Sequence, residues 1–269
     1  MVAIEYGKEK RDVIILLHGG GLSWWNFQEA AELLQHRFHV ILPILDGHAG
    51  SDRSFTDIES NAEEIISYID REYGGSVALI GGISLGAQIL TEMLSQRSDI
   101  CKYAVIESAL AIPMKLTHLL VKPMLNMSYG LIRQEWFAKL QFKSLKLKKE
   151  LYSNYYRDTC RINKKDMIAF LRSNSSYRAK SGLQKVKTAA YIFVGQREST
   201  KMFRSAQMLN RMLPNSRLKV MKGYFHGDFS ANHAEEYAEM IIRIMDQTSF
   251  KTSCTAVRLK HCQNDQNIL

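Results

Sequence analysis

Short apolar runs alternate with amphipathic segments along most of this chain. Residues 58–69 carry apolar side chains at i, i+4, i+7, i+8 and i+11, which predicts an amphipathic helix opened by Thr56 and Asp57. Helical spacing also covers residues 25–36, 84–96 and 237–245. The apolar runs predict buried strands at residues 13–17, 38–42, 77–80, 103–106, 189–194 and 218–221. Strands that alternate with helices predict an α/β fold, a doubly wound and mostly parallel sheet with helices on both faces.

Residues 112–182 interrupt this alternation. They contain about four helical stretches and no convincing strand, so we expect a helical cap that is inserted between two strands and seated over the sheet. The chain then divides into a core of residues 1–111 and 183–246, the cap, and a polar C-terminal tail of residues 247–269. We expect this tail to be disordered or loosely packed.

Positive charge is concentrated in the cap. Residues 112–182 hold fifteen Lys and Arg against four Asp and Glu, although the net charge of the whole chain is only +9. Lys143, Lys146, Lys148 and Lys149 lie in one short stretch, which we interpret as a solvated helix face. The alternative, which we do not favour, is that they attract anionic substrates or a membrane surface. No nucleic-acid-binding module is recognisable and the rest of the chain is net acidic, so nucleic-acid binding is not expected.

An apolar series in the cap supports two interpretations. It lines a pocket for an acyl chain, or it packs the first cap helix against the core. The series consists of Met114, Leu116, Leu119, Leu120, Met124, Leu125, Met127 and Leu131.

The chain begins with charged residues and has no apolar leader, so we expect a cytoplasmic protein. The longest uncharged stretch, residues 73–91, contains five glycines and is a poor candidate for a membrane span. Four cysteines, at positions 101, 160, 254 and 262, stand far apart without metal-ligand spacing, so neither disulfides nor a zinc site is expected.

The segment Gly82-Ile-Ser-Leu-Gly86 matches G-x-S-x-G and lies between a predicted strand and a predicted helix. A serine on such a sharp turn is lifted above the sheet, and side chains at the two glycine positions would collide with neighbouring backbone. The N-terminus of the following helix supplies N–H groups for developing negative charge. The motif therefore predicts Ser84 as a nucleophile.

A second glycine motif, His18-Gly-Gly-Gly21, also follows a predicted strand. Glycines allow the backbone to approach a substrate closely. We expect the backbone N–H groups of Gly20 and Leu85 to form an oxyanion hole, with Gly19 and Gly21 contacting the substrate. Trp24 is a candidate for lining the substrate pocket, whereas Trp25 is expected to anchor the core.

A nucleophilic serine needs a base and an acid that orients the base. We expect both to follow the serine along the chain. His226 lies on a glycine-rich loop after the last predicted strand and is the expected base. His233 is expected at the start of the closing helix, and His261 lies in the tail. For the acid, Glu198 follows the strand at 189–194 and is preferred, while Glu107, directly after the strand at 103–106, stays an alternative.

Two other acidic positions are given no catalytic role. Asp228 is too close in sequence to His226 to orient it and is expected to be a loop or capping residue. The glycine-rich loop at residues 46–52 contains no plausible catalytic pair and is expected to shape the sheet edge beside the serine.

Taken together, residues 13–246 resemble the α/β-hydrolase superfamily, in particular its capped esterase and lipase-like branch. The resemblance implies an eight-stranded, mostly parallel sheet, a Ser–acid–His triad, a cap between the sixth and seventh strands, and no metal or organic cofactor. Two departures stand out: the family acid is most often Asp, and the N-terminus has little room for the first one or two strands. The motifs that carry the resemblance are HGGG at 18–21, DGHAGSD at 46–52, GISLG at 82–86, GQRE at 195–198 and FHGD at 225–228.

The expected activity is hydrolysis of a small-molecule carboxylic ester through an acyl-enzyme on Ser84. Within the same superfamily, a thioesterase or a C–C bond hydrolase or lyase is an alternative, and so is a ligand-binding protein without catalysis. The sequence makes no prediction about the acyl chain or the oligomeric state.

Overall fold

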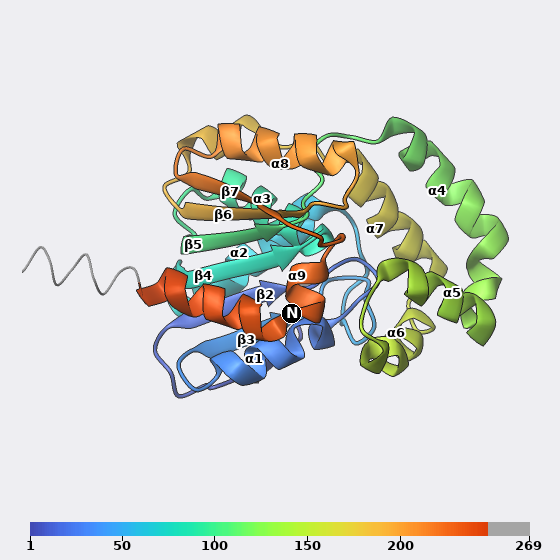
Figure 1. The fold of residues 1–269 in the computed structure, drawn as a ribbon, viewed down its shortest axis with the longest axis horizontal. Coiled ribbons are helices and arrows are strands. Elements are labelled where there is room, and N and C mark those ends of the chain that lie inside the picture. The colour runs from blue at the N-terminus through green and yellow to red at the C-terminus, as the bar shows by residue number, and fades with distance from the viewer. Residues whose placement is uncertain (247–269) are drawn as a thin grey trace, which may run out of the picture.

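A computed structural model of the protein describes residues 1–246. These residues form a sheet of seven strands in the order β1-β3-β2-β4-β5-β6-β7, in which β1 is antiparallel to β3 and the other pairs are parallel (Figure 1). The strands are β1 (Ala3–Tyr6), β2 (Val13–Leu17), β3 (His39–Pro43), β4 (Val77–Ile83), β5 (Cys101–Glu107), β6 (Ala189–Gly195) and β7 (Ser216–Met221).

All six strands expected from apolar runs are present, and their ends differ from the expected ones by at most three residues. The additional strand is β1, which pairs Ala3 with Pro43 along the free edge of β3. The sheet has one strand fewer than the eight that the resemblance implies, as the short N-terminus suggested.

Helices cover both faces of the sheet because successive residues of each strand point to opposite sides. Ile15 and Leu17 of β2 face one apolar core with α2, α3 and α8, whereas Ile14 and Leu16 face a second core with α1 and the helix at residues 234–246. These helices are α1 (Gln28–Leu34), α2 (Ile58–Tyr73), α3 (Leu85–Gln96) and α8 (Thr200–Met212), and a short helix, α9 (Asp228–Asn232), precedes the last one.

The boundaries of α2 follow from its capping residues. The Asp57 side chain accepts a hydrogen bond from the Ser60 N–H at 2.7 Å, which satisfies a donor at the helix N-terminus. Gly74 ends the helix in the left-handed conformation, at φ 64°. The helix start expected at Thr56 and Asp57 is confirmed.

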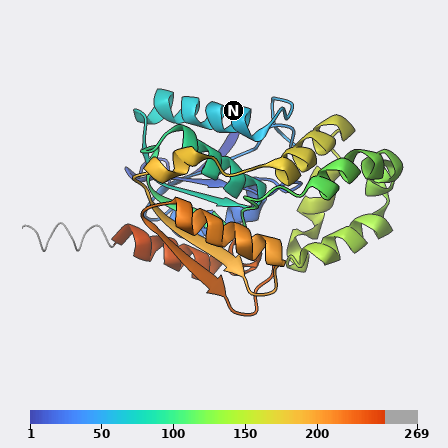
Figure 2. The same cartoon turned by 90° about the horizontal axis from the view of Figure 1, so that it is seen from above.

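The cap follows β5 and returns to β6. Its four α-helices lie beyond the carboxyl ends of the parallel strands, beside the core (Figures 1 and 2). In the eight-stranded count that the resemblance implies, β5 takes the sixth place, so the insertion point agrees with the expectation. The cap comprises α4 (Lys115–Ser128), α5 (Glu135–Leu145), α6 (Tyr152–Thr159) and α7 (Lys164–Ser176), with 3₁₀ turns at Tyr129–Arg133, Lys149–Leu151 and Ser181–Lys185.

Two buried carboxylates fasten the cap to the core. Asp158 of α6 accepts a hydrogen bond from the Trp25 indole N–H at 2.8 Å, and Trp25 is 2% exposed. Asp166 of α7 accepts one from the Phe55 backbone N–H at 3.0 Å. Trp25 is therefore a core anchor, as expected, and it also ties the first 3₁₀ turn (Trp24–Phe27) to the cap.

The structure corrects both interpretations of the cap surface. Helix α4 buries none of its residues completely, and of the apolar series Leu125 packs against the main core while most of the others are exposed. No member of the series lines the pocket described below. The four lysines do not share one helix face either. Helix α5 ends at Leu145, Lys146 adopts the left-handed conformation that terminates it, and Lys148 pairs with Glu29.

No helix within residues 1–246 is long and apolar enough to cross a membrane. The same residues contain no group of three or more His, Cys, Asp or Glu arranged to hold a metal ion. The expectations for the tail, including His261, Cys254 and Cys262, lie outside the described residues.

Candidate active site

Ser84 occupies the turn between β4 and α3. Its backbone has φ 52° and ψ −112°, an unfavourable conformation for a residue with a side chain. A Cβ atom at Gly86 would lie 2.1 Å from the Leu17 carbonyl oxygen, and one at Gly82 would lie 2.6 Å from the carbonyl oxygen of Gly86. Both positions thus require glycine, and the turn places Ser84 at the carboxyl edge of the sheet.

The structure brings together three side chains that the sequence singled out. His226 Nε2 lies 3.0 Å from Ser84 Oγ, and His226 Nδ1 lies 2.7 Å from Glu198 Oε2. These residues come from the β4–α3 turn, the loop before α9 and the loop after β6. The result is a continuous hydrogen-bonded chain from a hydroxyl through an imidazole to a carboxylate.

The Glu198 carboxylate is buried, with its side chain 1% exposed. Its other oxygen, Oε1, accepts hydrogen bonds from the Gly195 N–H at 2.7 Å and from the Ser108 hydroxyl at 2.8 Å. Burial raises the pKa of Glu198, but His226 and these donors outweigh burial and hold the pKa below its ordinary value. Glu198 therefore remains ionised and fixed in orientation.

His226 is about half exposed, with 49% of its side chain accessible. Desolvation lowers its pKa, but the hydrogen bond and the charge of Glu198 outweigh desolvation, so the pKa lies above the ordinary value of 6.5. A raised pKa makes the imidazole a stronger base toward the Ser84 hydroxyl.

Glu107, the alternative acid, does not contact the His226 ring by a hydrogen bond. It is 2% exposed and accepts hydrogen bonds from the backbone N–H groups of Phe229 and Ser230, at 3.1 and 3.2 Å, at the start of α9. Burial raises its pKa to about 7. Glu107 thus supports the segment that carries His226, while Glu198 faces the imidazole.

The glycine motif after β2 lies beside Ser84. Gly19 and Gly20 line the same pocket as Ser84, whereas Gly21 and Trp24 are absent from its lining. The Gly21 N–H donates to His48 Nε2 at 3.0 Å, and Trp24 packs between two apolar clusters. Neither of these two residues lies in the pocket wall, where Leu22 is found, so their contact with a substrate stays a prediction.

Two buried histidines hold this glycine loop in place. His18 Nδ1 donates to the Gly19 carbonyl, and His18 Nε2 accepts from the Leu45 N–H at 3.1 Å. His48 Nδ1 donates to the Asp46 carbonyl while its Nε2 accepts from Gly21. Burial lowers the pKa of His48 to about 4 and lowers that of His18 as well, so both rings are neutral and each can accept a backbone N–H.

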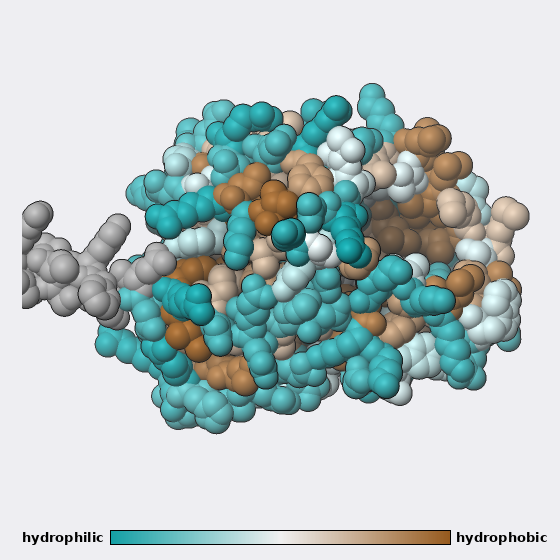
Figure 3. Space-filling model, in the orientation of Figure 1, coloured by the Kyte–Doolittle hydropathy of each residue, from teal (hydrophilic) through white to brown (hydrophobic). Residues whose placement is uncertain are grey.

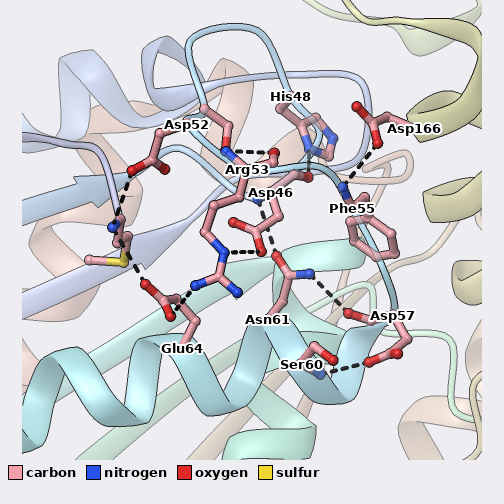
Figure 4. Close-up of polar contacts among 12 residues, drawn as sticks. Asp46, His48, Asp52, Arg53, Phe55, Asp57, Ser60, Asn61, Glu64 and Asp166 are labelled. Atoms are coloured by element: carbon pink, nitrogen blue, oxygen red, sulfur yellow. Dashed lines mark hydrogen bonds and ion pairs between the residues drawn. The ribbon is translucent and has the colours of Figure 1, made fainter.

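The loop at residues 46–52 is fixed by a polar network (Figure 4). The Asp46 N–H donates to Asn61 of α2 at 3.2 Å, and Arg53 bridges to Glu64 and Asp46. The His48 ring stacks on Phe170 of α7, with ring centroids 4.6 Å apart. This loop therefore joins α2, the cap and the glycine motif, which extends the shaping role expected of it.

The pocket at Ser84 has a volume of about 480 Å³. Core loops form one side of it, and the end of α5 with the following residues forms another. Its apolar lining consists of Leu22, Ile83, Leu145, Leu147, Met202 and Phe225, and Arg197, Lys146 and Ser199 add polar groups.

Sequence reasoning missed Ser108 and His48. Ser108 directly follows β5 at the carboxyl edge of the sheet, has φ 55°, and its Oγ also lies 3.4 Å from the Gly227 N–H. The available signal was a hydroxyl residue at the end of the strand next to β4, which leads into the turn that carries Ser84. His48 lies in the glycine-rich loop that was assigned no side-chain chemistry. Asp228 acts within its own loop, accepting from the Phe225 N–H at 3.2 Å, as expected.

Comparison with known proteins agrees with the fold. A family model described as alpha/beta hydrolase fold matches residues 12–232. The chain therefore belongs to the α/β-hydrolase fold family.

Among curated proteins, an AB hydrolase superfamily protein from Gibberella zeae is 31% identical over 137 residues, which cover 48% of this chain and 45% of that protein. The chain thus matches about half the length of this relative.

Solved structures share the fold at low identity. A thermophilic esterase from Thermogutta terrifontis is similar with a TM-score of 0.75 and 15% identity, covering 91% of this chain and 93% of that chain. A meta-cleavage product hydrolase from Pseudomonas fluorescens gives a TM-score of 0.70 and 16% identity, covering 91% and 94%. Proteins named for different reactions therefore share this architecture, so the activity must be argued from the site.

Proposed function

We propose that the protein is a serine hydrolase that cleaves small-molecule carboxylic esters through an acyl-enzyme intermediate. The proposal rests on one observation above all, the hydrogen-bonded chain of Ser84, His226 and Glu198 at distances of 3.0 and 2.7 Å. That chain lies in a pocket with apolar walls, which suits the hydrocarbon part of an ester.

In the first half-reaction, Ser84 Oγ attacks the ester carbonyl carbon and its proton passes to His226 Nε2. Glu198 holds the Nδ1 proton and stabilises the imidazolium that forms. Backbone N–H groups of Gly20 and Leu85 bind the oxyanion of the tetrahedral intermediate. When the bond to the leaving oxygen breaks, His226 gives its proton to that oxygen, and the alcohol leaves.

In the second half-reaction, water enters from the pocket and gives a proton to His226 Nε2 as its oxygen attacks the acyl carbon. Collapse of the second tetrahedral intermediate returns the proton to Ser84 and releases the carboxylic acid. Removing one oxyanion donor from such a site costs on the order of 10²–10³ in kcat. The buried histidines His18 and His48 assist indirectly, because they keep the glycine loop in its conformation.

A panel of p-nitrophenyl esters from acetate to laurate tests the proposal. We expect turnover of at least part of the series by the wild type and none above background by Ser84→Ala. If the protein hydrolysed thioesters but no ester, the proposal would be replaced by a thioesterase. If it cleaved a C–C bond next to a carbonyl group but no ester, the proposal would be replaced by a C–C hydrolase. Absence of turnover on all three classes would favour a ligand-binding protein.

A further inference from the structure

Exposed large apolar side chains gather in the cap. Ten of the twelve exposed large apolar residues within residues 1–246 belong to it, and the other two are Leu33 and Val220. Contiguous exposed apolar surface of this kind marks an interaction site. The ten are Leu116, Leu119, Leu120, Met124, Met127, Leu131, Trp136, Leu140, Leu145 and Leu171.

Helix α4 shows the exposure of apolar side chains most clearly. It is fourteen residues long and buries none of them. His118 ties it to α7, donating to the Arg172 carbonyl and accepting from the Arg172 guanidinium at 2.9 Å. The helix is therefore held from one side, while Leu119, at 68% exposure, and Met127, at 87%, remain open.

Helix α5 continues this surface. Ala138 and Phe142 face inward and are buried, whereas Trp136 and Leu140 are 62% and 60% exposed. Figure 3 shows apolar residues gathered around a hollow in the region of the cap helices α4 and α5. We refer to the exposed residues of α4, of the 3₁₀ turn at Tyr129–Arg133 and of α5 as the cap face.

The cap face is also basic. Residues 115–146 contain six Lys and Arg and a single acidic residue, Glu135, and Lys139 pairs with Glu135 at 2.8 Å. Lys115, Lys122, Arg133, Lys139 and Lys143 are all exposed. Exposed apolar side chains and exposed cations thus occur together on α4, the 3₁₀ turn and α5.

We propose that the cap face docks on the surface of a membrane containing anionic phospholipids. Helices with exposed Leu, Met and Trp flanked by Lys and Arg bind at the boundary between headgroups and acyl chains. The basic residues add attraction to anionic headgroups. A second copy of the chain is a poor occupant, because pairing two cap faces would bring their positive charges together.

The position of the catalytic pocket agrees with docking of this face. Residues 144–147, at the end of α5, line the pocket that contains Ser84. Because Ser144 and Leu145 belong both to the cap face and to the pocket lining, a membrane on the cap face lies close to the pocket. Docking itself does not depend on the proposed ester hydrolysis, so the two proposals are tested separately.

Vesicle sedimentation with Ser84→Ala protein tests docking without interference from turnover. The vesicles contain phosphatidylcholine alone or with about one quarter phosphatidylglycerol, so that the negative surface charge is the variable. We expect preferential binding to the anionic vesicles and weakening of that binding by salt. Lys122→Glu should weaken binding by at least about fivefold, and Leu119→Glu with Met127→Glu by more than about tenfold.

Two matched controls share the chemistry of these changes but lie on the core. Leu33→Glu alters an exposed leucine of α1, 44% exposed, and Lys219→Glu alters an exposed lysine of β7. Both should bind vesicles as the parent does. All four variants should retain turnover of a water-soluble short-chain ester when Ser84 is present, since none of the altered residues lines the pocket.

Fluorescence identifies the contacting face directly. Trp136 is exposed, whereas Trp24 and Trp25 are half-buried and buried, so brominated lipids should quench emission in the parent and not in Trp136→Phe. Equal sedimentation of the parent and the cap variants, or the absence of quenching at Trp136, would overturn the proposal. The proposal would also be overturned if the parent protein were a dimer, the double variant Leu119→Glu with Met127→Glu were a monomer, and neither protein bound vesicles.

Discussion

The substitution Glu198→Gln tests how the imidazole of His226 is held. Glu198 Oε1 accepts hydrogen bonds from the Gly195 N–H at 2.7 Å and from the Ser108 hydroxyl at 2.8 Å. The Gly195 N–H requires an oxygen at that position, so glutamine will keep its carbonyl oxygen there and turn its NH₂ group toward His226. Nδ1, which lies 2.7 Å from the second carboxylate oxygen, then accepts a hydrogen bond, and the ring proton moves to Nε2.

With its proton on Nε2, the imidazole cannot take the proton of Ser84. Loss of the correct tautomer in a Ser–His–acid site lowers kcat by about 10⁴, and we expect a loss of about 10³–10⁴ for Glu198→Gln with little change in KM. The assay is steady-state hydrolysis of the best p-nitrophenyl ester at saturating substrate, with circular dichroism to confirm folding.

Glu107→Gln is the matched control, because it makes the same chemical change at the competing position. Glu107 bonds to the backbone of Phe229 and Ser230, not to the imidazole. A glutamine oxygen can still accept one of these N–H groups, so kcat should change by less than about tenfold. A larger loss in Glu107→Gln than in Glu198→Gln would refute the assignment of the orienting acid.

Three further predictions concern the surroundings of the site. Ser108→Ala removes one hydrogen bond to the Glu198 carboxylate, so kcat should fall by about 10- to 100-fold with KM little changed, and an unchanged kcat would contradict a positioning role. Glu198 raises the pKa of His226 above 6.5, and catalysis needs the neutral ring. The value of kcat/KM should therefore decline with falling pH at a midpoint above 6.5 in the wild type and at a lower pH in Glu198→Gln. Both midpoints are measured from pH–rate profiles. Burial raises the pKa of Glu107 from 4.5 to about 7, so its stabilising proton is lost as pH rises through 7. Glu107→Gln should therefore gain stability relative to the wild type between pH 5 and pH 9, by up to about 3 kcal/mol in denaturant unfolding, and a constant difference across that range would contradict the shifted pKa.

The strands and the turn that carries Ser84 were predictable because their signals are local. Five consecutive apolar residues at 13–17 and the glycines around Ser84 report burial and close backbone approach directly in the sequence. Strand β1 was not predicted, because its four residues are only partly buried and it joins the sheet at an edge.

The choice between Glu198 and Glu107 stayed open because it depends on contacts between distant residues. Both residues lie close to the carboxyl ends of adjacent strands, and only the side-chain geometry shows which one faces His226. Ser108 was missed for the same reason, since its partner Glu198 lies 90 residues away in the chain.

The cap surface was misjudged because periodicity identifies an amphipathic helix but not what its apolar side contacts. The apolar series of α4 has the spacing of a packed helix, yet the helix is attached to α7 by its other side and leaves most of that series exposed. The residue types alone do not show whether the apolar side of such a helix is packed or exposed.

Labelling with a fluorophosphonate probe tests the nucleophile most directly, because the probe reacts with an activated serine whatever the natural substrate is. The wild type should be labelled, mass spectrometry should place the adduct on Ser84, and Glu198→Gln should react much more slowly. Ser84→Ala, folded as judged by circular dichroism, should remain unlabelled. Equal labelling of Ser84→Ala and the wild type would contradict the assignment of Ser84 and with it the proposed mechanism.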